Sequence, residues 1–243
     1  MIVLNSVSKE SGRGPFRRLM VDNVTWTISR RERIAIFGHR GTGVSHLLEI
    51  IAGTSLPTTG WVTRQGKTSL PGGYLKFAGF GTARTLIDRL CVLYNADPRE
   101  VAEFVDVGLQ SRHALDIPMR LLPPLVRKKL NYALIYAIPC DTYLFDGGIP
   151  GGGTPAFRAF CERAFDMRQR QAGIIMTLYS SQAASALDKS MKGAILHRSK
   201  FTLYEHIYDA ASVFASLPPE EPPSNAEHLT DPVPQHEEEE IFY

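Results

Sequence analysis

A glycine-rich segment that ends in a hydroxyl side chain is the first feature of this sequence that could do chemistry. Residues 38 to 46 read GHRGTGVSH, which fits the phosphate-binding pattern G-x-x-x-x-G-K-[ST] at every defined position except the lysine. In such a loop successive N–H groups converge on phosphate oxygens, and the following helix N-terminus adds partial positive charge. The expected binding residues are Gly38, Arg40, Gly41, Thr42, Gly43, Val44, Ser45 and His46.

Val44 stands where this pattern has its lysine. An apolar side chain cannot reach the β- and γ-phosphates as a lysine does. Arg40 and His46 are the cationic candidates for partial compensation, and Ser45 stands where a hydroxyl would meet Mg²⁺. The alternative interpretation is a glycine-rich turn between a strand and a helix, without a ligand.

A second candidate metal ligand lies about 100 residues downstream, where Asp146 follows the apolar strand expected over residues 142–145. This is the context of the acidic residue that holds Mg²⁺ in P-loop proteins. A lone Asp after a strand can also cap a turn. We interpret Ser45 and Asp146 as a metal-binding pair and predict that their side chains lie next to each other.

Apolar runs alternate with helical patterns along the chain and predict the elements that position these residues. The alternation favours an α/β fold with a mainly parallel sheet. We expect strands at 33–37, 142–146 and 173–178, helices after the glycine loop and at 129–138 and 180–190, and a hairpin of 193–197 and 201–204 before a last helix.

Composition divides the chain into a domain of residues 1–216 and a tail of residues 217–243. The tail has eight acidic residues, six prolines and no Lys or Arg, so we expect it to be disordered. The net charge of +2 leaves the rest of the chain at about +10. Its basic residues are scattered, so we expect no nucleic-acid partner.

The chain is expected to stay in the cytoplasm, because it has neither a leader pattern nor an apolar run of about 20 residues. Its three cysteines are far apart and form no CxxC pair. They suggest neither a disulfide framework nor a zinc site. We expect Cys91, Cys140 and Cys161 to be buried, reduced thiols.

These motifs resemble those of the ATP-binding subunits of ABC transporters, in particular the kind that exports capsular polysaccharide. Besides the glycine loop and residues 141–146, the resemblance rests on the apolar-Ala-Gly segment at 50–53, the Pro-x-x-Gly turn at 57–60 and, for the capsule type, LPGG at 70–73. It implies a P-loop NTPase-like ABC nucleotide-binding domain with a mainly parallel central sheet, N-terminal antiparallel strands and a helical subdomain.

The resemblance also implies ATP and Mg²⁺ as cofactors and a membrane permease as partner, in a homodimer or in a heterodimer with an active ATPase subunit. The location would be peripheral to the inner membrane. Several positions depart from the family pattern. No Gln occurs from 66 to 109, and LLPPL at 121–125 stands where a Ser-Gly-Gly run would open a helix. Proline has no N–H to donate there.

The family's catalytic Glu corresponds to Gly147, and its switch histidine corresponds to Leu178 or Tyr179. The aromatic residue that stacks on adenine corresponds to Glu10 or Ser11. We therefore expect a pseudo-ATPase subunit with weak or absent binding of ATP and Mg²⁺. The alternatives are a weakly active NTPase that uses Arg40 or His46, with Asp141 as a possible base, and an adaptor that presents the acidic tail to a partner.

Overall fold

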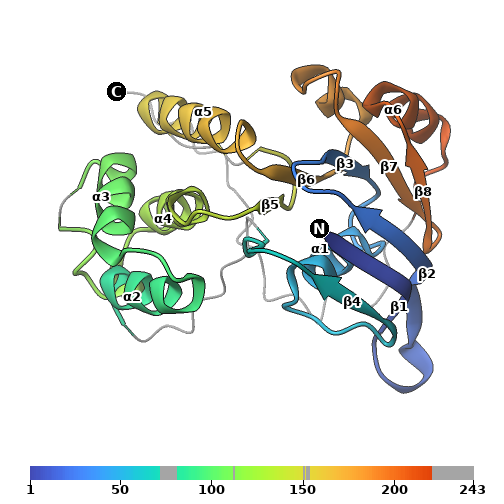
Figure 1. The fold of residues 1–243 in the computed structure, drawn as a ribbon, viewed down its shortest axis with the longest axis horizontal. Coiled ribbons are helices and arrows are strands. Elements are labelled where there is room, and N and C mark those ends of the chain that lie inside the picture. Colours follow the sequence, from blue (N-terminus) through green and yellow to red (C-terminus); the bar gives the residue numbers. More distant parts are fainter. Residues whose placement is uncertain (72–80, 112, 150, 152–153, 221–243) are drawn as a thin grey trace, which may run out of the picture.

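The structure is a computed structural model that describes residues 1–71, 81–111, 113–149, 151 and 154–220. Its elements form two sheets with helices packed around them (Figure 1). The described residues contain no helix long and apolar enough to cross a membrane. Of the LPGG segment, residues 72 and 73 lie outside the described residues.

The central sheet has the strand order β5-β6-β3-β7-β8 and is parallel except for β8. All the strands that we expected in this sheet are confirmed, and so is the hairpin of β7 and β8. Apolar residues predominate in the four parallel strands because both faces of the sheet are covered there, whereas the edge strand β8 is mostly exposed. The strands are β3 Arg33–Phe37, β5 Thr142–Phe145, β6 Gly173–Leu178, β7 Lys192–His197 and β8 Lys200–Tyr204.

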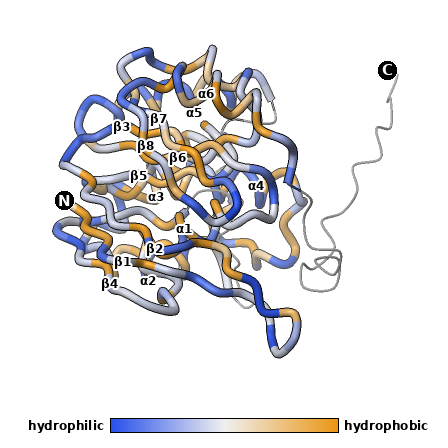
Figure 2. The backbone as a smooth tube through the Cα atoms, turned by 90° about the vertical axis from the view of Figure 1, so that its right-hand side faces the viewer, coloured by the Kyte–Doolittle hydropathy of each residue, from blue (hydrophilic) through white to orange (hydrophobic). Residues whose placement is uncertain are grey.

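A second, antiparallel sheet has the order β2-β1-β4. Its strands are β1 Ile2–Ser11, β2 Arg18–Ile28 and β4 Thr59–Arg64, and helix α1 (Val44–Ala52) packs with it against the central sheet. Strand β3 alternates between two cores: Ile34 and Ile36 face this side, whereas Ala35 and Phe37 face the larger core on the other side. In Figure 2 the β1–β2 connection projects from the body as a mainly hydrophilic segment.

The larger core collects the remaining helices. Helices α2, α3 and α4 lie together at the opposite end of the molecule from the β1–β2 connection (Figure 1) and form the expected helical subdomain. The bounds are α2 Ala83–Tyr94, α3 Pro98–Leu109, α4 Pro124–Ala137, α5 Pro155–Gln169 and α6 Ile207–Ser216, with 3-10 turns η1 Gly14–Phe16 and η2 Met119–Leu121.

The helix expected over 180–190 is wrong in length and type, because the structure has only a 3-10 helix, η3 (Ser181–Ala186). Its small side chains bury a single residue, Ala184, which is too little apolar surface to hold a longer helix. The helix expected over 129–138 exists but begins earlier, at Pro124.

The last described residues lie against the domain. Leu217 packs on the larger core, and the side chain of Glu220 accepts a hydrogen bond from the Arg198 N–H at 2.5 Å. We predicted disorder for residues 217–243, and residues 221–243 of this tail lie outside the described residues.

Candidate functional site

The glycine loop runs from the end of β3 to the start of α1, as its pattern predicts. Gly43 has φ +114°, and an added Cβ would lie 2.4 Å from the Met20 carbonyl oxygen, so a side chain has no room there. None of the N–H groups of Gly43, Val44 and Ser45 donates a hydrogen bond to another described residue. Free N–H groups at a helix N-terminus form a cradle that fits a phosphate.

Ser45 and Asp146 lie on either side of one phenol, so their predicted proximity is confirmed. The Tyr179 hydroxyl donates to Asp146 Oδ1 at 2.5 Å and lies 3.2 Å from Ser45 Oγ. Because a phenol has one hydrogen, Ser45 is the donor in the second contact. The candidate metal ligands are thus joined through a protein side chain.

Asp146 has a second side-chain donor beside Tyr179. The Thr177 hydroxyl donates to the same Asp146 oxygen at 2.6 Å and accepts from the Gly147 N–H at 2.9 Å. Thr177 is completely buried within β6. A polar side chain in an otherwise apolar strand needs a buried partner. The threonine within the apolar run of β6 was therefore a sequence signal for Thr177 that our motif analysis missed.

Tyr179 is also held from outside the site. The guanidinium of the exposed Arg40 lies 4.5 Å from the centroid of its ring, in cation–π range. Burial is the main cause that raises the pKa of the Tyr179 phenol, and the hydrogen bond to Asp146 is the second. The phenol therefore stays protonated, and remains a donor, throughout the physiological pH range.

The two residues proposed to replace the missing lysine differ in charge. Burial lowers the pKa of His46, an effect that Glu49 partly opposes. The imidazole is therefore neutral near pH 7 and supplies no positive charge. Val44 is fully buried. A Cβ added to Gly38 would lie 2.4 Å from Val44 Cγ1, so the Val44 side chain packs across the loop. Arg40 is the remaining cationic candidate.

Helix α4 begins where the resemblance places the family's Ser-Gly-Gly run. Pro123 is its N-cap residue and Pro124 its first residue, and no side chain caps this end. Neither proline has an N–H, so this helix N-terminus offers fewer donors to an anion than an ordinary one.

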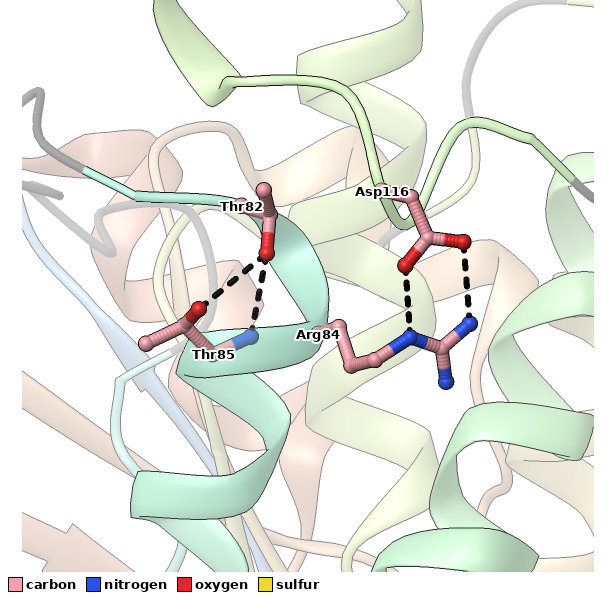
Figure 3. Close-up of polar contacts among 4 residues, drawn as sticks. All are labelled: Thr82, Arg84, Thr85 and Asp116. Carbon is pink, nitrogen blue, oxygen red and sulfur yellow. Dashed lines mark hydrogen bonds and ion pairs between the residues drawn. The ribbon is translucent and has the colours of Figure 1, made fainter.

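The segment that leads into α2 is fixed by polar contacts that Figure 3 shows. Thr82 Oγ1 accepts from the Thr85 N–H at 3.3 Å, and Arg84 binds both oxygens of Asp116 at 2.6 and 3.1 Å. The hydrogen bond between Arg84 and Asp116 raises the pKa of Arg84 and lowers the pKa of Asp116. Both side chains are exposed, so solvent screens this pair.

Of the other predicted positions, Glu10 lies at the end of β1 and pairs with Arg17 at 2.7 Å. Asp141 accepts a hydrogen bond from the Lys67 N–H at 2.7 Å, at the opposite end of β5 from Asp146. The structure therefore does not bring Asp141 to the loop. Cys91 and Cys161 are buried and Cys140 is partly buried, and all three are free thiols.

Solved structures with the same arrangement define the class of the fold. The chain aligns with the ATP-binding cassette MJ0796, whose dimer is described as bound to ADP and Pi, with a TM-score of 0.69 and 15% identity over 85% of this chain and 99% of that chain. An ATP-binding subunit of an ABC transporter gives a TM-score of 0.66 and 16% identity over 88% of this chain and 93% of that chain. The fold is that of an ABC nucleotide-binding domain.

Sequence comparisons agree with the fold. Residues 21–83 match the ABC transporter family model. The chain is 28% identical to the capsule polysaccharide export ATP-binding protein CtrD of Neisseria meningitidis serogroup B, over 90% of this chain and 100% of that protein. It is 28% identical to the ATP-binding protein BexA of Haemophilus influenzae, over 75% of this chain and 84% of that protein. The chain is thus similar to the ATP-binding proteins of ABC transporters, in particular to those of capsule and polysaccharide export.

ABC ATPases bind ATP and Mg²⁺, and this site fits the two ligands differently. The backbone cradle fits a phosphate. The side chains do not fit the metal as they stand, because Mg²⁺ needs its oxygen ligands at about 2.0–2.1 Å and the Tyr179 hydroxyl lies between Ser45 and Asp146. No hydrolytic step can be derived through this arrangement.

Proposed function

We propose that the chain is a pseudo-ATPase subunit of an ABC transporter that exports capsular or other cell-surface polysaccharide. The observation that carries the proposal is the Tyr179 hydroxyl between Ser45 and Asp146. It binds both candidate metal ligands, and a half-buried phenol bound to a carboxylate is not displaced without breaking a charge-assisted hydrogen bond.

Three further features support the absence of turnover. Gly147 has no side chain to act as a base, and its φ of +90° is strained for any other residue. Val44 supplies no charge to a phosphate. The proline pair at the start of α4 weakens the surface that would cover a second subunit's nucleotide. A positioned base and a phosphate-clamping charge each contribute orders of magnitude to the rate.

Residual affinity for nucleotide or phosphate, if present, resides in the backbone from Gly41 to Ser45. A cradle without lysine or an adenine-stacking aromatic residue binds weakly. We therefore expect a Kd for ATP and Mg²⁺ in the millimolar range at best, which corresponds to a binding free energy of about 4 kcal/mol. Such a subunit contributes shape and contacts to a transporter, and beside an active ATPase subunit the energy comes from that subunit.

The proposed partner is a membrane permease subunit, with this chain at the cytoplasmic side of the inner membrane, as a homodimer or beside an active ATPase subunit. The helical subdomain presents large apolar side chains to solvent. Val92 on α2 is 85% exposed, Leu93 71% and Val107 on α3 66%. These exposed apolar side chains on both helices make the helical subdomain the candidate contact surface.

The decisive experiment is an ATPase assay of the purified chain, alone and with the copurified permease, alongside the variants Asp146→Asn and Val44→Lys. We expect no magnesium-dependent turnover from any of the three proteins. Turnover by the unmodified chain that Asp146→Asn abolishes would contradict the pseudo-ATPase role. Turnover by Val44→Lys alone would show that the lysine is the only essential loss.

The permease contact needs its own test, because it can be correct whether or not the chain hydrolyses ATP. Leu93→Asp should reduce copurification of the permease, while the exposed substitution Leu203→Asp on β8 serves as the control. Both side chains are exposed, so neither substitution disturbs the core. Equal copurification of both variants would remove α2 from the proposed contact.

A weakly active NTPase is the second candidate, and the position of Arg40 favours it. Its guanidinium lies at the Tyr179 ring, close to the candidate metal pair, and it is free of ion pairs with the described residues. If it replaces the lysine, ATP should bind with micromolar affinity and Arg40→Ala should abolish that binding. Calorimetry with both proteins decides between the candidates.

A further inference from the structure

His39, a residue of the glycine loop that is not among the expected phosphate-binding residues, comes together with two side chains from the C-terminal part of the chain. Strands β3 and β7 are parallel neighbours in which Phe37 pairs with Ile195. His39 and His197 each follow their paired residue by two positions, so the register places them side by side at the same end of the sheet. Their ring centroids are 6.2 Å apart, in an edge-on arrangement.

The third side chain comes from the end of the described chain. Glu220 lies four residues beyond α6, and its Oε1 is 2.7 Å from His197 Nδ1. The same oxygen accepts from the Arg198 N–H, which fixes the carboxylate over the β7–β8 turn. One donor atom from each of His39, His197 and Glu220 can be chosen so that all three lie within 4.8 Å of one another.

The surroundings are drier than those of an ordinary surface pair. The side chains of His197 and Glu220 are only 15% and 19% exposed, and the His39 ring packs at 4.9 Å against Phe214. His39 Nδ1 is buried and has no hydrogen-bond partner among the described residues. His197 Nδ1 is close to Glu220, but the contact lacks hydrogen-bond geometry.

We propose that His39, His197 and Glu220 form a binding site for a divalent transition-metal ion of the zinc class. Two imidazoles and one carboxylate are a donor set typical of zinc, with a fourth position left for water. Zinc at about 2.0–2.2 Å from each donor would draw the donors to about 3.4 Å from one another. Rotation of the Glu220 side chain, which follows a helix rather than lying within one, allows this contraction.

The proposed ion would tie two functional parts of the chain together. His39 is the second residue of the glycine loop, and its carbonyl oxygen accepts the hydrogen bonds of the Thr42 N–H and hydroxyl. Glu220 begins the charged part of the tail. A bound ion would therefore fix the start of the acidic tail to the loop, whatever the loop's own ligand, so this proposal does not depend on the pseudo-ATPase role.

The test uses untagged full-length protein and zinc sulfate alone, with calorimetry for affinity and metal analysis after dialysis for stoichiometry. We expect one zinc per chain, a rise in Tm on adding zinc, and loss of affinity by at least about tenfold in His39→Gln, His197→Gln and Glu220→Gln. Glu220→Gln is the critical variant, since it keeps the side-chain shape and lies outside the core.

Two controls separate this site from other histidines. His113→Gln removes an exposed imidazole of the helical subdomain, and a double change of His228 and His236 to Gln removes the tail imidazoles. Both proteins should bind zinc like the unmodified chain. Cobalt in place of zinc should give the intense visible absorption of a four-coordinate site, which Glu220→Gln should alter.

Two results would overturn the proposal. The first is the absence of stoichiometric zinc binding to the unmodified chain, which would leave His197 and Glu220 as a close contact without a metal role. The second is binding that persists in the three ligand variants and disappears in the His228 and His236 double variant.

Discussion

The hydroxyl of Tyr179 determines what Ser45 and Asp146 can do. A phenol carries one hydrogen, and here that hydrogen points to a carboxylate while a serine donates to the oxygen. This satisfies all three polar groups without a metal ion. A P-loop fold can therefore keep its candidate metal ligands and still be stable with both of them bound to a tyrosine hydroxyl.

Tyr179→Phe should separate the stability of this arrangement from its effect on ligands. Loss of a hydrogen bond to a charged group should lower the free energy of unfolding by about 1.5–3 kcal/mol. It should also strengthen magnesium-dependent ATP binding, because the Asp146 and Ser45 oxygens become available. Urea denaturation and calorimetry measure the two effects.

Tyr208→Phe is the matched control, because this tyrosine is 38% exposed on α6 and should change neither quantity. A Tyr179→Phe protein of unchanged stability would show that the phenol is not a structural bridge. Unchanged ATP binding in a destabilised variant would show that the bridge does not restrict the metal.

Strands and helices follow from the sequence to different degrees. The apolar runs at 33–37 and 173–178 predict β3 and β6 because a parallel sheet covered on both faces needs apolar side chains throughout. The helix expected at 180–190 fails because its alternation of small and polar residues leaves no apolar face to bury. Periodicity alone cannot show how much surface a helix covers once the neighbouring elements are in place.

Helix α2 offers a test of which local contacts hold an element in place. Thr82→Ala removes the hydroxyl that caps its N-terminus and should cost about 1 kcal/mol of stability. Asp116→Asn breaks the exposed pair with Arg84 and should cost less, since exposed pairs contribute little. Hydrogen exchange along α2 should rise more in the first variant, and the reverse order would show that the ion pair positions the helix.

Buried ionisable groups give the whole molecule a predictable response to alkaline pH. Burial raises the pKa of Tyr94 and Tyr143 to about 12, and that of Cys161 to about 11, from ordinary values of 10.0 and 9.0. Above pH 9 the unfolded chain loses these protons before the folded chain does. Stability is therefore full below pH 9 and should fall from pH 9 to 12.

Thermal unfolding between pH 7 and 12, followed together with phenolate absorbance, measures this response. Tm should decline above pH 9, and the buried phenols should ionise only on unfolding. A Tm that stays constant to pH 12 would contradict the burial of these side chains.

The candidate sites differ in how far sequence could reveal them. Ser45 and Asp146 belong to motifs with a known spacing, so their proximity was predictable. The group of His39, His197 and Glu220 was not, because His39 is more than 150 residues from the other two. The three meet only through the register of β3 with β7 and the return of the chain after α6. No local pattern encodes that meeting.

The position where the tail leaves the domain can be tested by two deletions. Removing residues 221–243 should leave Tm almost unchanged, because a segment this acidic and rich in proline cannot bury enough apolar surface to stabilise itself. Removing residues 217–243 also removes Leu217 from the core and Glu220 from His197, and it should lower Tm by a few degrees, on the order of 1 kcal/mol. Both deletions remove acidic charge from a basic body, so both should increase retention on anionic vesicles at low salt, an effect that salt screens.

Two outcomes would move the domain boundary. Equal Tm values for the two deletions would place it before Leu217. A large loss of Tm on removal of residues 221–243 alone would show that residues beyond Glu220 are an ordered part of the domain.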